Sequence, residues 1–400
     1  MRRRRREAGA ALVVALGALL ILTAIAVGIA SAVRVRALGA LNDYRQEALL
    51  EAARGGVNLA RAVLEQDEQF AADSLDEEWA QPLEVELPDG TLVSVVIEDA
   101  SARLNVNWAS KEMLMALPGM TEEMADCLLD WVDADDETRP FGAESDFYQT
   151  LDPPYDAANQ ALSRLDEVLQ VKEWTPGRLY RPQAPEVSDL ALADLLTVHS
   201  GERDVSGTGE ARLNLNSATE RQIRGRLEPL IGELAVAGLL SYRQQHGTFR
   251  SLGELFEVPF AQGSDAVILD EVTVSTQEPR NTVNVNTAPL EVLRALPGMN
   301  EELAQAIVDR REGQDGPLLQ RGDLLAVVGA GPLRQMIDYV ATRSAVFLVT
   351  ATARPASGRG YRTIRAEVRR GPERTMVTAW QEVYEAVPPL ESEEVEIETQ

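Results

Sequence analysis

The chain has 400 residues, 45% of them apolar, and a formal net charge of -26. This composition supports a packed core and disfavours nonspecific binding to nucleic acid or to anionic membrane surfaces. The single cysteine excludes an intrachain disulfide, and one cysteine with two histidines cannot build the usual zinc sites. No nucleophile motif surrounds His199 or His246, so the sequence predicts a protein that is not an enzyme.

A basic leader and a long apolar run open the chain. Arg2 to Arg6 are consecutive arginines, and no charged residue occurs from Ala8 to Val33. About 20 apolar residues cross a bilayer core, and a basic flank tends to stay in the cytoplasm. The sequence therefore predicts one transmembrane helix that leaves the rest of the chain outside the cytoplasm.

An amphipathic helix and a β-hairpin are expected next. From Leu38 to Gln66 apolar residues recur at helical spacing, so the helix should continue, with Gly55-Gly56 able to bend it. Leu83 to Leu87 and Thr91 to Glu98 then alternate between apolar and polar residues on either side of Pro88-Asp89-Gly90. An Asp-Gly pair between two alternating runs predicts an antiparallel hairpin.

A motif containing two asparagines recurs three times, at Arg103 to Asn107, Arg212 to Asn216 and Thr282 to Asn286. Two copies lead into Ala-Leu-Pro-Gly-Met, at Ala116 to Met120 and Ala295 to Met299, and then into an acidic helical pattern. A Pro-Gly turn between two short helices is typical of helix-hairpin-helix units. The middle of the chain is therefore expected to be a repeated helical structure.

Helix-hairpin-helix turns often bind DNA by pointing backbone amides at phosphate groups. Here Thr121 and Asn300 stand where a second glycine is expected, and the pairs Glu122-Glu123 and Glu301-Glu302 follow them. These carboxylates would repel phosphate, so the sequence favours a structural helical scaffold over a DNA-binding one.

The densest acidic cluster lies between Asp130 and Asp146. Asp133, Asp135 and Glu144 match positions one, three and twelve of an EF-hand loop, but Thr138 occupies the position of its required glycine. The segment is therefore not an EF-hand. A calcium-binding loop and a solvated acidic loop remain open alternatives from the residues alone.

The C-terminal part returns to a β pattern, with alternating strands expected at Val346 to Thr352, Arg362 to Val368 and Thr375 to Val383. The last ten residues, Glu391 to Gln400, are acidic and are predicted to be disordered. Taken together, the elements predict an α+β fold.

Several of these features resemble the K-type minor pseudopilins of the type II secretion system (GspK). The resemblance rests on the Arg-Arg-Glu-Ala-Gly leader, the Asn-x-Asn and Leu-Pro-Gly units, and Gly142 to Tyr148. It implies a long N-terminal transmembrane helix and a pseudopilin-type antiparallel sheet, interrupted by a large α-helical insertion of SAM-like or helix-hairpin-helix character. The implied order is leader 1–9, transmembrane helix 10–33, first core part 34–107, an insertion with two units 108–280, second core part 281–384 and acidic tail 385–400.

The resemblance also implies particular site residues. Prepilin peptidase would cut after Gly9, and Ala10 would become the methylated N-terminus. Val14 takes the fifth mature position, where most pseudopilins carry a glutamate that K-type proteins commonly lack. Calcium is expected in the acidic loop, and the expected ligands are Asp133, Asp135, Asp136, Glu144 and Asp146.

The function implied is that of a non-enzymatic subunit at the tip of the pseudopilus, which helps to initiate assembly and to control filament length. Its expected partners are the I- and J-type minor pseudopilins, the major pseudopilin, the inner-membrane assembly platform and prepilin peptidase. Its expected location is the inner membrane, with a cytoplasmic N-terminus and a periplasmic body. The alternatives are a membrane-anchored, competence-like DNA receptor and a minor pilin of a type IV pilus.

Overall fold

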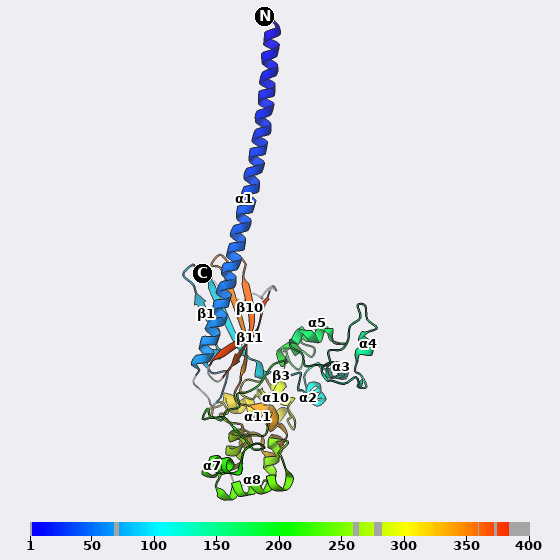
Figure 1. Ribbon diagram of the computed structural model, residues 1–400, viewed down its shortest axis with the longest axis vertical. Coiled ribbons are helices and arrows are strands. Elements are labelled where there is room, and N and C mark those ends of the chain that lie inside the picture. Colours follow the sequence, from blue (N-terminus) through cyan, green and yellow to red (C-terminus); the bar gives the residue numbers. More distant parts are fainter. Residues whose placement is uncertain are drawn as a thin grey trace, which may run out of the picture.

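The computed structural model is elongated, with a helical stem, a five-stranded sheet at the end of the stem, and further helices beyond the sheet (Figure 1). This α+β architecture confirms the predicted fold class. The structure describes residues 2–67, 72–258, 264–275, 282–358, 360–371 and 374–383, with the backbone alone at 2–14 and 264–265. The predicted acidic tail lies outside these residues.

The stem is one helix, α1, from Arg2 to Gln66. Its described N-terminal half exposes large apolar side chains such as Leu20 and Ile21, and α1 is long and apolar enough to cross a membrane. Its C-terminal half buries Leu49, Ala53, Val57, Ala60 and Leu64 against the sheet. Because these residues recur every three or four positions, they lie on one helix face.

The Gly55-Gly56 pair does not break α1, which continues unbroken through it. A Cβ atom at Gly56 would lie 3.0 Å from side-chain atoms of Val93, Val95 and Ala351, whereas one at Gly55 would meet nothing within 4 Å. Gly56 therefore allows the helix to approach the sheet closely. The glycine pair was expected to be a place where the helix could bend, but its observed role is in packing.

The sheet is antiparallel, in the order β1-β2-β9-β10-β11. Its strands are β1 (Leu83–Glu86), β2 (Leu92–Asp99), β9 (Val346–Arg354), β10 (Arg362–Arg370) and β11 (Thr375–Val383). The predicted hairpin and C-terminal strands are thus confirmed, and Gly90 makes the hairpin turn with a φ of 79°. One sheet face packs on α1, and the 3₁₀ helix η1 (Glu78–Ala80) adds Trp79 to this core.

Three helical units separate β2 from β9, and each opens and closes with a two-residue strand of a parallel pair. The first unit contains η2 (Ala100–Ala102) at its entry, then β3 (Leu104–Asn105), α2 (Lys111–Met115), α3 (Glu122–Val132), α4 (Ser145–Tyr148), η3 (Leu165–Gln170), α5 (Pro176–Tyr180), α6 (Leu192–Leu195) and β4 (Leu196–Thr197). The second contains β5 (Leu213–Asn214), α7 (Glu220–Ile231), α8 (Glu233–His246), η4 (Leu252–Glu257), α9 (Ser264–Glu271) and β6 (Val272–Thr273). The third contains β7 (Val283–Asn284), α10 (Leu290–Arg294), α11 (Glu301–Glu312), η5 (Arg321–Asp323), α12 (Leu324–Val328), α13 (Ala330–Met336), η6 (Ile337–Tyr339) and β8 (Val340–Ala341).

The third unit differs from the predicted domain boundary at residue 281. Its buried side chains, from Val283 to Val340, belong to the same apolar cluster as the other two units, while the sheet and α1 form a separate cluster. The chain rejoins the sheet only at Val346, the first residue of β9. The inserted region therefore holds three units and extends about sixty residues beyond the expected end.

The second asparagine of each repeated motif explains why the motif recurs. In the first unit the Asn107 side-chain amide donates to the carbonyls of Leu162 and Val198, and its oxygen accepts from the Leu162 backbone. Asn216 bonds in the same way to Phe249 and Val274, and Asn286 to Leu318 and Thr342. Each asparagine thus satisfies buried backbone groups of two later segments and closes its unit.

In the two Pro-Gly turns the glycine makes the turn, and the residue two positions after it caps the following helix. Gly119 and Gly298 both have a φ of 76°, a conformation that glycine adopts without strain. The side chains of Thr121 and Asn300 then cap α3 and α11, accepting from the backbone of Met124 and Leu303. The helices expected after these turns are confirmed.

The three units meet the sheet at one buried junction. The side chain of Asp99, at the end of β2, accepts hydrogen bonds from the Ser101 backbone and the Ser344 hydroxyl at 2.7 and 2.6 Å. The inserted region therefore leaves and re-enters the sheet at the same carboxylate. Gly201, which follows the first unit, bonds to Ser101 and to Ala345 at the same place.

A buried ionic cluster joins the units to one another. Arg212 pairs with Glu202 at 2.7 Å and with Asp270 at 3.3 Å, and Arg343 pairs with Asp270 at 2.5 Å. Arg321, whose side chain has no exposed surface, lies 3.6 Å from Glu202. Because these residues come from the second unit, the third unit and the segments beside them, the cluster fixes how the units are oriented.

Candidate metal centre

The acidic loop is held by two buried carboxylates of α3. Asp126 and Asp130 lie one helical turn apart and are both fully buried. Asp126 accepts from the Phe141 backbone at 3.3 Å and pairs with Lys111 at 2.7 Å. Asp130 accepts from the Arg139 backbone at 3.2 Å and from its guanidinium at 2.6 Å. The loop is therefore ordered by the helix before it.

Position 142 in this loop has no room for a side chain, which explains why a glycine occupies it. A Cβ atom there would lie 1.8 Å from Oδ2 of Asp130, so any side chain would displace the carboxylate. The next residues bring Glu144 into the protein, where it is 3% exposed.

Glu144 is the strongest indication of a ligand. Within the described part of the chain, neither of its carboxylate oxygens has a hydrogen-bond partner. Burial, followed by the charges of Asp130 and Asp133, raises the pKa of Glu144 to about 7. A buried carboxylate without donors is costly unless a proton or a cation compensates its charge.

The other expected ligands lie at different depths. Asp133 is half-buried and pairs through Oδ2 with Arg139 at 2.6 Å, while its Oδ1 has no partner among the described residues. Asp135 and Asp136 are exposed, and Asp146 is exposed in the first turn of α4. Of the five expected ligands, Glu144 and Asp133 thus have buried carboxylate oxygens, whereas Asp135, Asp136 and Asp146 are exposed.

Asn159 was not predicted as a site residue. Its side-chain amide donates to the Asp135 carbonyl at 3.3 Å and to Oδ1 of Asp136 at 3.1 Å. Its buried Oδ1 has no partner within the described residues, and its φ is 44°. Asparagine tolerates this left-handed conformation, but nothing in the sequence pattern links it to a loop more than twenty residues earlier.

The donors of the loop fit a hard cation such as calcium, because carboxylate, amide and backbone oxygens are its preferred ligands. Four oxygen atoms there are buried and have no hydrogen-bond partner among the described residues: Oδ1 of Asp133, both carboxylate oxygens of Glu144 and Oδ1 of Asn159. Arg139 already neutralises part of the local negative charge.

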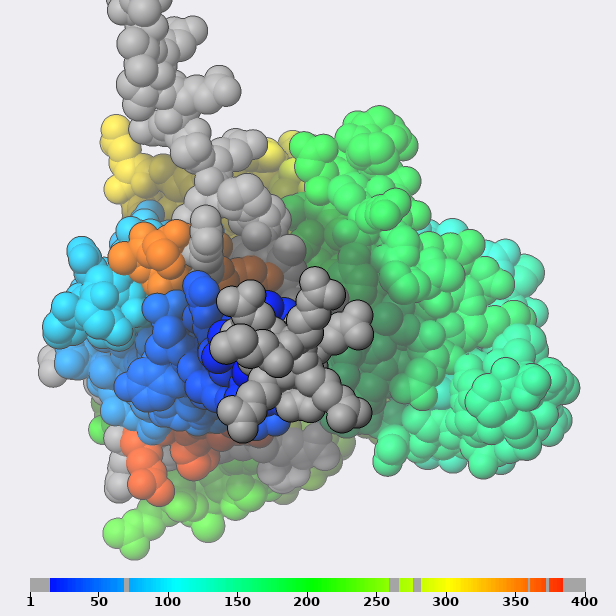
Figure 2. Space-filling model, turned by 90° about the horizontal axis from the view of Figure 1, so that it is seen from above, coloured from blue at the N-terminus to red at the C-terminus, as the bar shows by residue number. Residues whose placement is uncertain are grey.

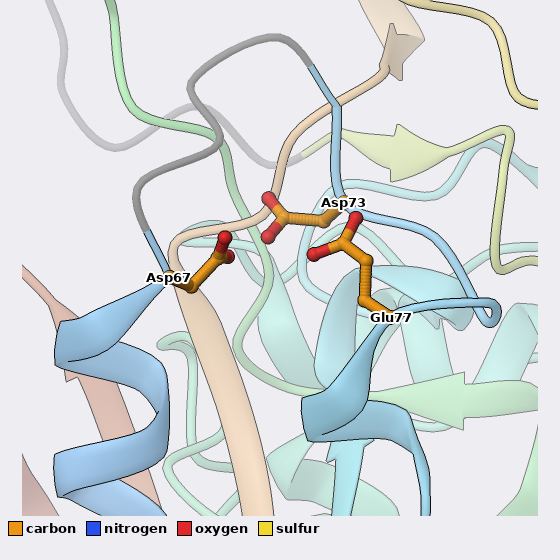
Figure 3. A group of neighbouring side chains, drawn as sticks. All are labelled: Asp67, Asp73 and Glu77. Atoms are coloured by element: carbon orange, nitrogen blue, oxygen red, sulfur yellow. The ribbon is translucent and has the colours of Figure 1, made fainter.

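A different carboxylate group converges more tightly. Among the described residues, one ligand atom from each of Asp67, Asp73 and Glu77 lies within 4.8 Å of the others (Figure 3). However, Arg370 pairs with Asp67 at 2.9 Å and with Asp73 at 2.7 Å. Glu77 accepts from the Ser74 backbone and the Trp79 indole, each at 2.9 Å. Since these oxygens have donors, the acidic loop is the better candidate for a cation.

Two sequence families match parts of the chain. A family model described as type II secretion system protein K matches residues 95–188, which include the acidic loop. A helix-hairpin-helix model matches residues 278–334, which form most of the third unit.

Curated relatives and a solved structure agree with these matches. The chain is 31% identical over 187 residues to the putative type II secretion system protein K of Escherichia coli K12, covering 41% of this chain and 52% of that protein. It is 30% identical over 194 residues to protein K of Pseudomonas aeruginosa PAO1, covering 42% of this chain and 58% of that protein. The chain thus matches little more than half the length of these relatives.

The crystal structure of the GspK-GspI-GspJ complex from enterotoxigenic E. coli contains a chain of the same fold. The TM-score is 0.50 at 16% identity, and the match covers 86% of this chain and 99% of that chain. At this identity the likeness concerns the fold alone. The chain is therefore similar in sequence to protein K of type II secretion systems over residues 95–188 and over the parts matched by these relatives, and it shares its fold with a chain of the GspK-GspI-GspJ complex.

Proposed function

We propose that this protein is a structural subunit at the tip of the type II secretion pseudopilus, and that it caps the filament and limits its length. The observation that carries this proposal is the position of the helical units. They lie beyond the sheet, at the end of the molecule opposite the N-terminus (Figure 1). Seen along α1, the first unit projects to one side of the stem (Figure 2). A subunit this wide fits the end of a narrow helical filament better than its interior.

The stem supplies the attachment. In the proposal, prepilin peptidase cuts after Gly9, Ala10 is methylated, and the mature helix leaves the inner membrane to pack among other stems. The structure describes the backbone of Gly9, Ala10 and Val14 within α1 but not their side chains. A glutamate without a partner is costly in lipid, so valine at position 14 suits a subunit that is not followed by another.

The partners in this proposal are the I- and J-type minor pseudopilins. The related structure is a complex that contains GspI and GspJ. The major pseudopilin and the assembly platform would contact the same stem during assembly, while the periplasmic body performs no catalysis.

Calcium is proposed for the acidic loop, with Glu144 and Asp133 as the inner ligands and Asn159 beside them. Bound calcium would supply positive charge to the buried Glu144 carboxylate, which burial otherwise keeps partly protonated near neutral pH. The ion would thereby stiffen the loop between α3 and α4.

The capping role is tested by removing residues 103–342 and joining the ends with a short Gly-Ser linker. Ser101 and Ser344 both bond to Asp99, so a short linker can close the gap without disturbing the sheet. We expect a body that still assembles but gives pseudopili of abnormal length. Filaments of normal length and number would show that the helical units do not cap, provided that the shortened protein accumulates in the membrane.

A membrane-anchored DNA receptor is the alternative from another class. The helix starts that would face phosphate are already capped by Thr121 and Asn300, and glutamates follow both caps. Salt-sensitive DNA binding by the purified protein would favour the receptor over the pseudopilin tip.

A further inference from the structure

We infer that Arg139 limits how tightly the acidic loop binds calcium, because its guanidinium pairs with a carboxylate that the ion also requires. That carboxylate belongs to Asp133, which accepts a hydrogen bond of 2.6 Å from Nη1 of Arg139. The inference rests on the calcium binding proposed above and adds the residue that opposes it.

Asp130 of α3 holds Arg139 beside the loop. The Asp130 side chain has no exposed surface, and it accepts from the Arg139 backbone at 3.2 Å and from Nη1 of the guanidinium at 2.6 Å. The loop encloses this carboxylate, since a Cβ atom at Gly142 would lie 1.8 Å from its Oδ2. Because removing the guanidinium leaves a buried charge uncompensated, Arg139 stays at Asp130 whether or not it contacts Asp133.

Asp133 is the partner that Arg139 can release. The contact is partly open to water, with 34% of the Arg139 side chain and 25% of the Asp133 side chain exposed, so losing it costs little. The other oxygen of Asp133, Oδ1, is buried and has no hydrogen-bond partner within the described residues. An ion bound to both oxygens displaces Arg139. An ion bound to Oδ1 alone puts two cations on one carboxylate, where they repel each other.

Glu144 needs a cation that Arg139 does not supply. Both carboxylate oxygens of Glu144 are buried and lack a hydrogen-bond partner in the described part of the chain, whereas Arg139 pairs with Asp130 and Asp133. The loop, which is described throughout, also contains no three carboxylates whose ligand atoms lie within 4.8 Å of one another. An ion shared by Glu144 and Asp133 therefore requires these side chains to move together, and the bond from Arg139 resists that movement.

A purely structural role for Arg139 predicts the opposite effect on calcium. If Arg139 only ordered the loop, removing its guanidinium would loosen the ligands and weaken calcium binding. If it competes with the ion, removal strengthens binding, because Asp133 becomes available and a nearby positive charge is lost. The sign of the change in affinity therefore separates the two roles.

The test is calorimetric titration of calcium chloride into the full-length protein in detergent micelles. Arg139→Gln keeps an amide that can donate to Asp130, and it should tighten calcium binding by about fivefold to tenfold. The control is Arg164→Gln, which removes an exposed arginine of the same helical unit that pairs with Asp166. It should leave the dissociation constant within about twofold of the parent value. Unchanged or weaker binding by Arg139→Gln would overturn the inference.

A double-mutant cycle shows whether Arg139 acts through Asp133. In an Asp133→Asn background, Arg139→Gln should change calcium affinity by less than about twofold. An equal gain in both backgrounds would assign the effect to overall charge and would also overturn the inference. If the Asp133→Asn protein binds calcium too weakly for the cycle, the comparison of Arg139→Gln with Arg164→Gln decides.

Thermal melts show whether each variant folds. If Arg139→Gln does not, the paired change Arg139→Gln with Asp130→Asn removes both charges of the buried pair, leaves the net charge unchanged and should tighten binding by a similar factor. Failure of the parent and of every variant to bind at about millimolar calcium would refute the calcium site, and this inference with it. Binding by the parent protein without a gain in Arg139→Gln would refute this inference alone.

Discussion

Asn284 of β7 donates from its side-chain amide to Oδ2 of Asp99 in β2, over 2.9 Å and 185 residues of sequence. The same amide reaches the Asp73 carbonyl, which follows α1, and the Ser344 hydroxyl. Burial raises the pKa of Asp99, and hydrogen bonds from Ser344 and Thr287 oppose that rise. Asn284 is the first asparagine of the motif that recurs in all three helical units. In the third unit its side chain links the units to the sheet through Asp99.

Replacing Asn284 with alanine should lower the free energy of unfolding by about 2–3 kcal/mol, because it removes a donor from a buried carboxylate. The matched variant is Asn214→Ala in the second unit, where the amide donates to the Ser275 carbonyl in a half-buried site. Its expected cost is about 1 kcal/mol. Urea unfolding measures both, and equal costs would mean that the Asp99 contact adds nothing.

Gly56→Val should destabilise the contact between α1 and the sheet by about 1–3 kcal/mol through overpacking, since even a Cβ atom lies 3.0 Å from three side chains. Gly55→Ala, with open space around it, should instead stabilise the helix by up to about 1 kcal/mol. Thermal melts of the two variants should move in opposite directions. If both melting temperatures moved in the same direction, helix propensity rather than close approach to the sheet would explain the effect of the two glycines on stability.

Without calcium, stability should fall as the pH rises from about 4.5 to about 7, because the folded state holds the Glu144 proton more tightly than the unfolded chain does. Glu144→Gln should remove this dependence and should also remove most of the stabilisation by calcium. At one hundred times the dissociation constant that stabilisation is about 2.7 kcal/mol. Glu137→Gln, an exposed acid of the same loop, is the control and should change neither. Calcium stabilisation of Glu144→Gln equal to that of the parent protein would contradict the proposed centre.

His199 and Glu367 join the first helical unit to β10 through a 2.6 Å contact. The hydrogen bond to Glu367 raises the pKa of His199 above 6.5, and burial partly opposes that rise. The same bond lowers the pKa of Glu367, against the effect of burial. The pair therefore stabilises the protein most between about pH 4.5 and 6.5, and its contribution is lost as the pH rises through the raised histidine pKa. Comparing His199→Gln with the parent protein across this range should show a gap that closes at alkaline pH. A gap that persists there would assign it to packing.

Arg321→Ala should cost about 3–5 kcal/mol, since it leaves Glu202 with less compensation inside the protein. Arg321 also donates to the Leu269 carbonyl at 2.6 Å and the Val272 carbonyl at 3.2 Å, which ties the third unit to the second. Arg321→Lys should restore little of the loss, because lysine lacks the planar fork of donors. Hydrogen exchange of α9 reports the loosening directly, and unchanged protection there would show that the arginine does not hold the units together.

The acidic loop shows how far residue patterns reach. The density of carboxylates between Asp130 and Asp146 was enough to select the segment as a candidate, and within it Glu144 is buried and Asp133 half-buried. The pattern did not distinguish Asp130, which holds the loop through Arg139, from residues that could bind an ion. It also missed Asn159, because a residue that bonds to the loop from a distant segment leaves no local spacing to detect.

The stem, the hairpin and the C-terminal strands could be predicted from local periodicity, because the residues of each element alternate or recur at helical spacing within that element. The asparagine motif recurs three times in the sequence, but the prediction from it was an insertion with two helical units. Three features became known only from the tertiary structure. The third unit packs with the other two, Gly56 lies in close contact with the sheet, and Asp99 accepts hydrogen bonds from Ser101, Asn284 and Ser344. These outcomes depend on which surfaces meet, and burial between distant segments is fixed by packing of the whole chain.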